Sequence, residues 1–155
     1  FTDSAVDPRL SPVVTTDPGQ ATTDQWWQWT AFNKSGKLAV SYYDRQYGSD
    51  ETTGFSDVSL SGTGDLSNYA ILRVTSSSMP PPTEFGGTFL GDYSGLTAVD
   101  NAYPLWSDTR DPDLFLCPGT GTPTTAPALC TGSASNADVA NDQDIFTAAL
   151  PIPSK

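Results

Sequence analysis

The sequence has no histidine, only two cysteines and only seven basic residues, and each scarcity removes a class of function. A structural zinc site usually draws on histidine or on more than two cysteines, so the chain offers no pattern for one. Seven lysines and arginines against 18 aspartates and glutamates give a net charge of −11. Such a surface repels the phosphates of nucleic acids and anionic membranes, and we expect neither as a partner.

Long apolar segments are also missing. No run approaches the roughly 20 residues of a membrane-spanning helix, so we expect no membrane insertion. Helical spacing of apolar residues is lacking too, and we expect at most a turn or two of helix near residues 136–142. The 155 residues include 13 glycines and 13 prolines, which predicts an all-β fold of short antiparallel strands joined by turns.

The two cysteines, Cys117 and Cys130, lie 13 positions apart in a segment of proline, glycine and threonine. With no histidine in the chain, a disulfide is the pairing that we expect. It would close a surface loop and contribute on the order of 3 kcal/mol by the chain-entropy estimate. A disulfide also indicates an oxidising compartment, so we expect the protein to be secreted.

A strand–turn–strand pattern occurs twice, in residues 29–45 (WTAFNKSGKLAVSYYDR) and 91–110 (GDYSGLTAVDNAYPLWSDTR). Asparagine, aspartate and glycine in the turns favour hairpins of different length, which lets the two copies align. The alignment pairs Thr30 with Thr97, Tyr42 with Trp106, and Asp44 with Asp108.

Further strands are predicted at residues 55–62, 69–75 and 144–150. A repeated unit of about four antiparallel strands is typical of a β-propeller blade. Two blades cannot close a ring, so we expect the remaining blades of the same protein, or other copies of the chain, as partners. The expected units are residues 1–16 as the outer strand of a preceding blade or an extended arm, 17–79 as the first blade, and 80–155 as the second blade, with a disulfide-closed insertion at 111–143.

Three segments carry a family resemblance: residues 24–46, 85–111 and 143–150. They resemble the closing blades of secreted bacterial proteins of the sialidase-like, BNR-repeat β-propeller superfamily. The most specific part is Gly-Asp-Tyr-x-Gly-Leu followed by Trp-x-Asp-Thr-Arg. The Asp box of such blades (Ser/Thr-x-Asp-x-Gly-x-Thr-Phe/Trp) lacks its Ser-x-Asp spacing and its aromatic here, and Gly64 and Asp65 mark its degenerate trace.

The resemblance implies a glycan-directed protein of glycoside hydrolase type, with catalysis left open. Sialidases bind the sugar carboxylate with three arginines and use a tyrosine nucleophile. The resemblance therefore implies Arg45 and Arg110 as candidate sugar-binding arginines and Tyr93 as a candidate nucleophile. The chain has only four arginines, and the catalytic set is incomplete. In the alternative, each Asp/Arg strand end pins a loop and Tyr93 packs between blades.

Non-catalytic carbohydrate binding is a second interpretation. Tryptophan rings offer flat apolar faces to sugars, while aspartate and arginine take the hydroxyls. Tryptophan buried between sheets is the competing explanation. A lectin should show an exposed tryptophan beside unpaired polar groups, whereas an enzyme needs a deep pocket with convergent arginines or carboxylates. The candidate ligand-binding residues are Trp29, Asp44, Trp106 and Asp108.

A third interpretation is a structural subunit of an extracellular assembly, with calcium as a stabilising ion. Carboxylates flank the cysteine-containing loop, and hard oxygen donors suit Ca²⁺. Their spacing lacks the pattern and the glycine of an EF-hand, so a solvated acidic loop is the alternative. The candidate metal ligands are Asp111, Asp113, Asp142 and Asp144.

Overall fold

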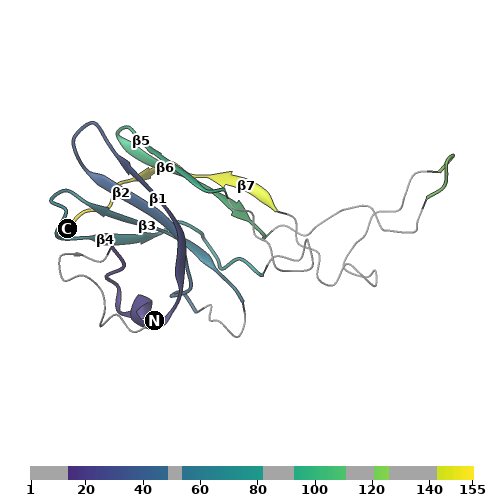
Figure 1. The fold of residues 1–155 in the computed structure, drawn as a ribbon, viewed down its shortest axis with the longest axis horizontal. Helices are drawn as coiled ribbons and strands as arrows, with labels where there is room; N and C mark the ends of the chain where they lie inside the picture. The colour runs from purple at the N-terminus through teal and green to yellow at the C-terminus, as the bar shows by residue number, and fades with distance from the viewer. Residues whose placement is uncertain (1–13, 49–53, 82–92, 111–120, 126–142) are drawn as a thin grey trace.

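The computed structural model describes residues 14–48, 54–81, 93–110, 121–125 and 143–155 (Figure 1). Within these ranges the chain forms two antiparallel sheets and a short 3-10 helix, η2 (Pro18–Thr22), and contains no α-helix. The predicted all-β, blade-like fold is therefore confirmed. The helical turn predicted at 136–142 lies outside the described residues.

The first sheet is a meander of four strands in the order β1-β2-β3-β4. Its strands are β1 (Gln25–Phe32), β2 (Leu38–Asp44), β3 (Asp57–Thr63) and β4 (Ala70–Arg73). The β1–β2 turn closes on Asn33, whose side-chain oxygen accepts hydrogen bonds from the following turn backbone. Short polar turns thus set consecutive strands side by side, as the turn residues predicted.

The second sheet contains β5 (Gly95–Ala98), β6 (Asn101–Asp108), β7 (Asp144–Thr147) and β8 (Leu150–Pro151). Strands β7 and β8 pair with the two halves of β6. The single strand predicted at 144–150 is therefore interrupted between Thr147 and Leu150.

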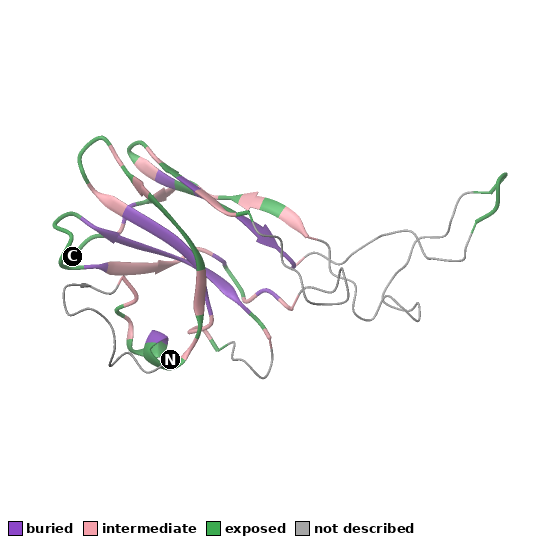
Figure 2. Ribbon diagram, viewed as in Figure 1, coloured by how far each residue is buried: buried purple, intermediate pink, exposed green. Residues whose placement is uncertain are grey.

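The second sheet packs on one face of the first (Figure 1). Two apolar clusters fill the contact, and strands β2, β3 and β6 contribute to both. Figure 2 shows the buried residues concentrated along these strands. Alternate β2 residues face the second sheet, as a two-residue side-chain period requires. The clusters are Ala39, Leu60, Leu96, Ala102 and Ile152, and Tyr43, Val58, Met79 and Trp106.

The opposite face of the first sheet meets the N-terminal segment. Gln20 of η2 is buried and donates hydrogen bonds to Tyr42 Oη at 2.8 Å and to Asp44 Oδ2 at 2.7 Å. Ser61 donates to the carbonyl oxygen of Val14 at 2.8 Å. Residues 14–16 are not in a strand, and the rest of the strand or arm predicted at 1–16 lies outside the described residues.

Candidate functional site

An open pocket of about 290 Å³ lies where β1 begins and β2 ends. It is lined by Asp24, Gln25, Trp26 and Arg45. The strands meet here because Gln25 pairs with Asp44, the residue before Arg45. One carboxylate, one amide, one guanidinium and one indole thus converge on a single pocket, which suits a ligand that both donates and accepts hydrogen bonds.

Arg45 is incompletely paired in this pocket. Its Nη1 lies 3.4 Å from Asp24 Oδ2, a long contact, and its guanidinium lies 5.1 Å from the centre of the Trp26 ring. Its Nε is buried and has no acceptor among the residues that the structure describes. A buried donor without an acceptor typically costs about 1–3 kcal/mol. Because Nε is enclosed, a ligand in the pocket would reach the exposed part of the Arg45 side chain rather than this atom.

A β-bulge at the start of β1 places two consecutive tryptophans on one side of the sheet. The register with β2 shifts between Trp26 and Trp29. Trp26 stacks on the Tyr43 ring with centroids 5.5 Å apart, and Trp27 meets the same ring edge-on at 5.7 Å. Consecutive residues of a regular strand point to opposite faces, so the bulge makes this arrangement possible.

Trp27 adopts a φ of +51°, which a bulky residue rarely takes. Its ring is partly exposed, and Trp29 is exposed over 52% of its surface. Strained backbone of this kind persists only where the surrounding structure enforces it, and it is frequent at ligand sites. The strained backbone at Trp27 therefore marks the start of β1 as a candidate ligand site.

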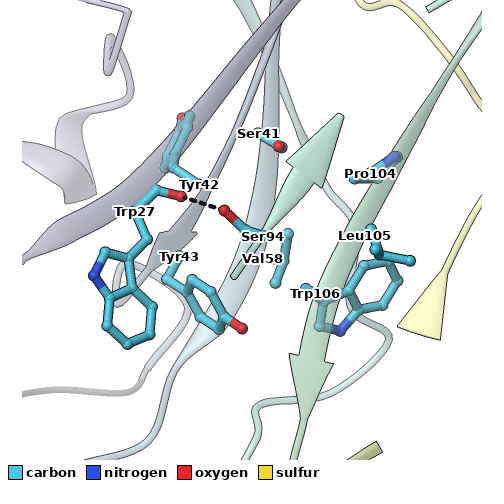
Figure 3. A pocket seen from close by; sticks show the side chains of 9 residues that line it. All are labelled: Trp27, Ser41, Tyr42, Tyr43, Val58, Ser94, Pro104, Leu105 and Trp106. Atoms are coloured by element: carbon cyan, nitrogen blue, oxygen red, sulfur yellow. Dashed lines mark hydrogen bonds between the residues drawn. The ribbon is translucent and has the colours of Figure 1, made fainter. Parts of the chain in front are cut away.

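Behind this bulge, the two sheets enclose a gap of about 10 Å³, which has room for one water molecule at most. Figure 3 shows Trp27 and Trp106 on its two sides, with Tyr43 between them. Ser94 donates a hydrogen bond to the Trp27 carbonyl oxygen at 3.3 Å and ties the bulge to the second sheet. A sugar does not fit in this gap. The tryptophan surface that a sugar could reach is therefore the solvent-exposed part of Trp27 and Trp29.

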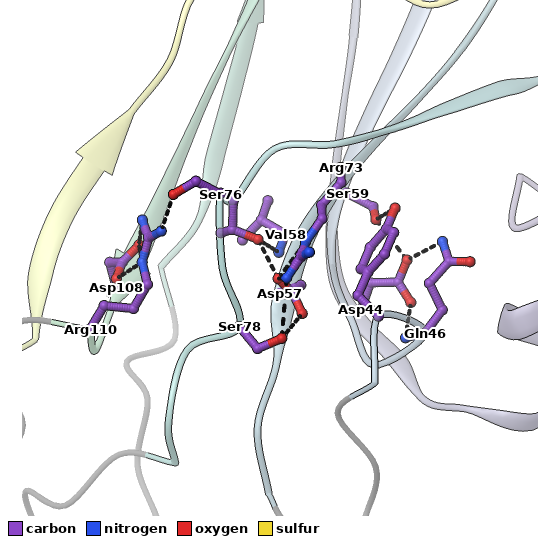
Figure 4. A network of polar contacts seen from close by, with 12 residues as sticks. Asp44, Gln46, Asp57, Val58, Ser59, Arg73, Ser76, Ser78, Asp108 and Arg110 are labelled. Carbon is purple, nitrogen blue, oxygen red and sulfur yellow. Dashed lines mark hydrogen bonds and ion pairs between the residues drawn. The ribbon is translucent and has the colours of Figure 1, made fainter.

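Three buried carboxylates form a polar network at one end of the strands (Figure 4). Asp44 accepts hydrogen bonds from the Ser59 hydroxyl at 2.7 Å and from the side chain and backbone of Gln46. Asp57 lies opposite Asp44 in the β2–β3 pair and binds Arg73 at 2.7 Å. Each carboxylate is already occupied within the fold.

Asp108, the third carboxylate, ends β6. It accepts hydrogen bonds from the Trp106 indole at 2.9 Å and from Arg110 Nη2 at 2.7 Å. Burial raises the pKa of Asp108, but the hydrogen bonds from Arg110 and Trp106, with the Arg110 charge, bring it below its usual value. Arg110 also reaches Ser76 at 2.9 Å, so this cluster anchors the loop after β4.

The β3–β4 turn is organised by Asp65. Its carboxylate accepts hydrogen bonds from the Thr63 hydroxyl, the backbone N–H groups of Ser67 and Asn68, and the Asn68 amide. These bonds, that of the Asn68 side chain first, hold the pKa of Asp65 well below its usual range. Thr63-Gly64-Asp65 has the Ser/Thr-x-Asp spacing of an Asp box, so the statement that this spacing is missing was wrong.

The residues singled out in the sequence have very different surroundings. Trp106, Asp108 and Asp44 are buried, with hydrogen bonds inside the molecule, whereas Trp29 is exposed. Their role as ligand-binding residues stays a prediction. Of the four, Trp29 has a side chain that a ligand could reach from solvent.

The three catalytic candidates have different surroundings. Tyr93 is 85% exposed, Arg45 lines the open pocket, and Arg110 is bound to Asp108. The repeated Asp/Arg strand ends also differ, since Arg110 pairs with the aspartate of its own strand end while Arg45 pairs with Asp24.

The predicted disulfide and most of the predicted calcium ligands lie outside the described residues: Cys117, Cys130, Asp111, Asp113 and Asp142. Asp144 is in β7, opposite Asp108. The described residues contain no group of three potential metal ligands. In the same part of the chain, no helix is long and apolar enough to cross a membrane.

Two groups were not singled out from the sequence. Asp24 and Gln25 line the pocket, and their only signal was a position directly before the tryptophan-rich strand. The buried carboxylate of Asp57 forms an ion pair with the partly exposed Arg73, 16 residues away, with no motif linking them. Comparison of the chain with known protein families, curated proteins and solved structures finds no match.

Proposed function

We propose that the chain is a non-catalytic carbohydrate-binding segment of a secreted, sialidase-like β-propeller protein. The observation that carries the proposal is the convergence of Asp24, Gln25, Trp26 and Arg45 on one open pocket, in which the ion pair between Arg45 and Asp24 is long, at 3.4 Å. A lectin was expected to have an exposed tryptophan beside unpaired polar groups. Here the tryptophan that lines the pocket, Trp26, is partly buried, and Trp29 is exposed further along the same strand. The Asp65 turn, which lies where the superfamily has its Asp box, supports the propeller part of the proposal.

The chemistry of the pocket suits a sugar with neighbouring hydroxyl groups. Arg45 donates to one hydroxyl oxygen, while the exposed carboxylate of Asp24 accepts from another. Gln25 offers its amide oxygen as an acceptor, since its NH2 group already donates to the Thr23 carbonyl at 2.7 Å, and the three side chains suit an uncharged polyol. The exposed ring of Trp29, further along β1, offers a separate apolar surface.

Catalysis has less support than binding. A sialidase mechanism needs several arginines around one sugar carboxylate and a nucleophile beside them. Within the described ranges, Arg110 is held by Asp108 outside the pocket that Arg45 lines, and Tyr93 projects into solvent. The pocket also contains Asp24, which repels a sugar carboxylate.

Glycan-array screening of the chain, followed by calorimetry with the best ligand, tests the proposal. Arg45→Gln should weaken binding at least about tenfold, because it removes the donor and its charge. Trp29→Ala should weaken binding as well. Phe32→Ala is the matched control: Phe32 is an exposed aromatic of the same strand, and three positions along β1 it lies on the face opposite Trp29.

Binding of no glycan on the array would refute the proposal. Equal losses in Phe32→Ala and Trp29→Ala would show that any exposed ring of β1 matters, and would also count against the site. Near-ultraviolet circular dichroism of each variant separates lost binding from lost folding.

A further inference from the structure

A second open pocket, of about 230 Å³, lies between the β1–β2 turn and the β5–β6 turn. The two turns lie side by side (Figure 1), and Lys34 of the first forms an ion pair with Asp100 of the second at 3.3 Å. Strand β8 joins them because Asn101 pairs with Pro151. Three segments that are far apart in the sequence thus build one pocket. Its lining includes Asn33, Ser35, Lys37, Asp100, Asn101 and Pro151.

Hydrogen bonds within each turn hold this lining in place. The Asn33 N–H donates to the Lys37 carbonyl oxygen at 2.9 Å, and Asn33 Oδ1 accepts from the Lys37 N–H at 2.8 Å. The Ser35 hydroxyl donates to the same Oδ1 at 3.0 Å. In the other turn, the Val99 N–H donates to the Asn101 carbonyl oxygen at 3.0 Å. A lining that is fixed in advance loses little conformational entropy when a ligand binds, which favours affinity.

Lys37 is the unusual residue of the pocket. With 18 acidic and 7 basic residues in the chain, a basic side chain has carboxylates in excess to pair with. Lys37 is partly buried, yet within the described residues its only hydrogen-bonding partner is the Ser154 hydroxyl, at 3.3 Å. Four other basic residues each form an ion pair with an aspartate: Lys34, Arg45, Arg73 and Arg110.

Further donors and acceptors surround Lys37. Within the described ranges, Asn33 Nδ2 and the Asn101 side-chain amide make no hydrogen bond. The Asp100 side chain is 85% exposed, and Lys34 offsets its charge. The pocket therefore differs from the one in which Arg45 and Asp24 pair with each other, because here the charge of Lys37 has no carboxylate beside it.

We infer that this pocket is a binding site for a hydroxylated carboxylate, such as a sugar acid. The carboxylate of the ligand accepts hydrogen bonds from the Lys37 ammonium group and from Asn33 Nδ2, and bonds of this charge-assisted kind are the stronger ones. The neighbouring hydroxyls of the ligand donate to Asp100 and bond to the Asn101 amide.

This inference is independent of the proposed function. The pocket shares no lining residue with the one that Arg45 lines. The two pockets lie at opposite ends of the β1–β2 hairpin, which puts them roughly 20 Å apart for strands of this length.

Titration of the ¹⁵N-labelled chain with sodium glucuronate, followed through the backbone amide signals in NMR spectra, tests the inference. The signals of residues 33–37 and 99–101 should shift and saturate, and sodium chloride at the same ionic strength should not reproduce the change. Glucose carries the same kind of hydroxyl groups without the carboxylate. It should bind at least about tenfold more weakly, because the charge-assisted bonds are lost.

Lys37→Gln should weaken glucuronate binding at least about tenfold, because it removes the ammonium group from the pocket. Lys155→Gln is the matched control. Lys155 is also without an ion pair among the described residues and follows Ser154, the partner of Lys37, but it does not line the pocket. The same spectra show whether each variant remains folded.

The absence of saturable shifts with glucuronate would overturn the inference. Shifts centred on residues 24–26 and 45 would overturn it too, because the ligand would then occupy the other pocket. Equal weakening in Lys37→Gln and Lys155→Gln would show a general effect of charge instead of a site. Equal affinity for glucose and glucuronate would refute the role of the carboxylate.

Discussion

Gly62 is a residue whose absence of a side chain is required by a neighbouring segment. It lies in β3, where a β-carbon would approach Ile152 Cγ2 to 2.8 Å and collide with the carbonyl oxygen of Pro153. Its backbone is not in the left-handed region, so the need for glycine comes from close packing alone. The segment after β8 can pack Ile152 into the core only because Gly62 has no side chain.

We predict that Gly62→Ala destabilises the fold by about 1–3 kcal/mol through overpacking. Urea unfolding followed by tryptophan fluorescence measures the change. Gly64→Ala is the matched control, because a β-carbon there meets nothing within 4 Å. Equal stability of Gly62→Ala and Gly64→Ala would show that the C-terminal segment does not press on β3.

The turn between β3 and β4 is the element whose stability should depend most visibly on acid. The pKa of Asp65 is well below its usual value, because the folded turn donates several hydrogen bonds to the carboxylate. A depressed pKa means that the ionised form stabilises the fold. This stabilisation is complete above about pH 4, the pKa of an unfolded aspartate, and is lost as the pH falls further.

Asp65→Asn should therefore be less stable than the wild type at pH 7, with a difference that shrinks as the pH falls from about 4 towards the folded-state pKa. Thermal unfolding across this range measures it. Asp100→Asn is the matched control, because Asp100 is another exposed aspartate, in the β5–β6 turn. It should change the thermal stability less than Asp65→Asn at both ends of the pH range. A pH-independent difference for Asp65→Asn would contradict the role of its charge.

The strand elements were largely predictable because their signals are local. Alternation and β-branched residues predicted strands at 55–62 and 69–75, and β3 and β4 are found there. The interruption between β7 and β8 was missed, because Ala148 and Ala149 continue the strand pattern and only pairing with β6 shows the break. The bulge in β1 was missed as well, since tryptophan gives no sequence sign of a positive φ.

At the scale of the molecule, the Tyr43 phenol connects the two sheets. Its oxygen donates to the Ser107 carbonyl at 2.9 Å and accepts from the Ser107 N–H at 3.0 Å. Burial raises the pKa of Tyr43 to about 12, against a smaller lowering by the bond to Ser107. Burial likewise raises the pKa of Tyr42, on the opposite face of β2.

A raised pKa means that the fold prefers the neutral phenol. The stabilisation from Tyr42 and Tyr43 is complete below about pH 10, where an unfolded tyrosine begins to ionise, and is lost as the pH rises towards the folded-state values. We therefore predict unfolding in this alkaline range, with phenolate absorbance appearing together with the loss of near-ultraviolet circular dichroism. Ionisation of all tyrosines before any loss of structure would contradict the prediction.

Tyr43→Phe removes both the hydrogen bonds to Ser107 and the ionisable phenol, and the two losses act at different pH values. It should cost about 1–3 kcal/mol at pH 7, because the buried Ser107 N–H loses its partner. It should also reduce the alkaline sensitivity, since one of the phenols whose pKa is raised by burial is gone.

By itself, the sequence determined the all-β class, most strand positions, the hairpin turns and the internal repeat, because each depends on alternation and turn residues within a few positions. Tertiary structure decided which of the highlighted side chains are accessible. Trp106, Asp44 and Asp108 are enclosed by segments far away in the chain, while Trp29 lies on an edge strand. The pairing of Arg45 with Asp24 was decided in the same way, since strand register brings residues 21 positions apart to one pocket.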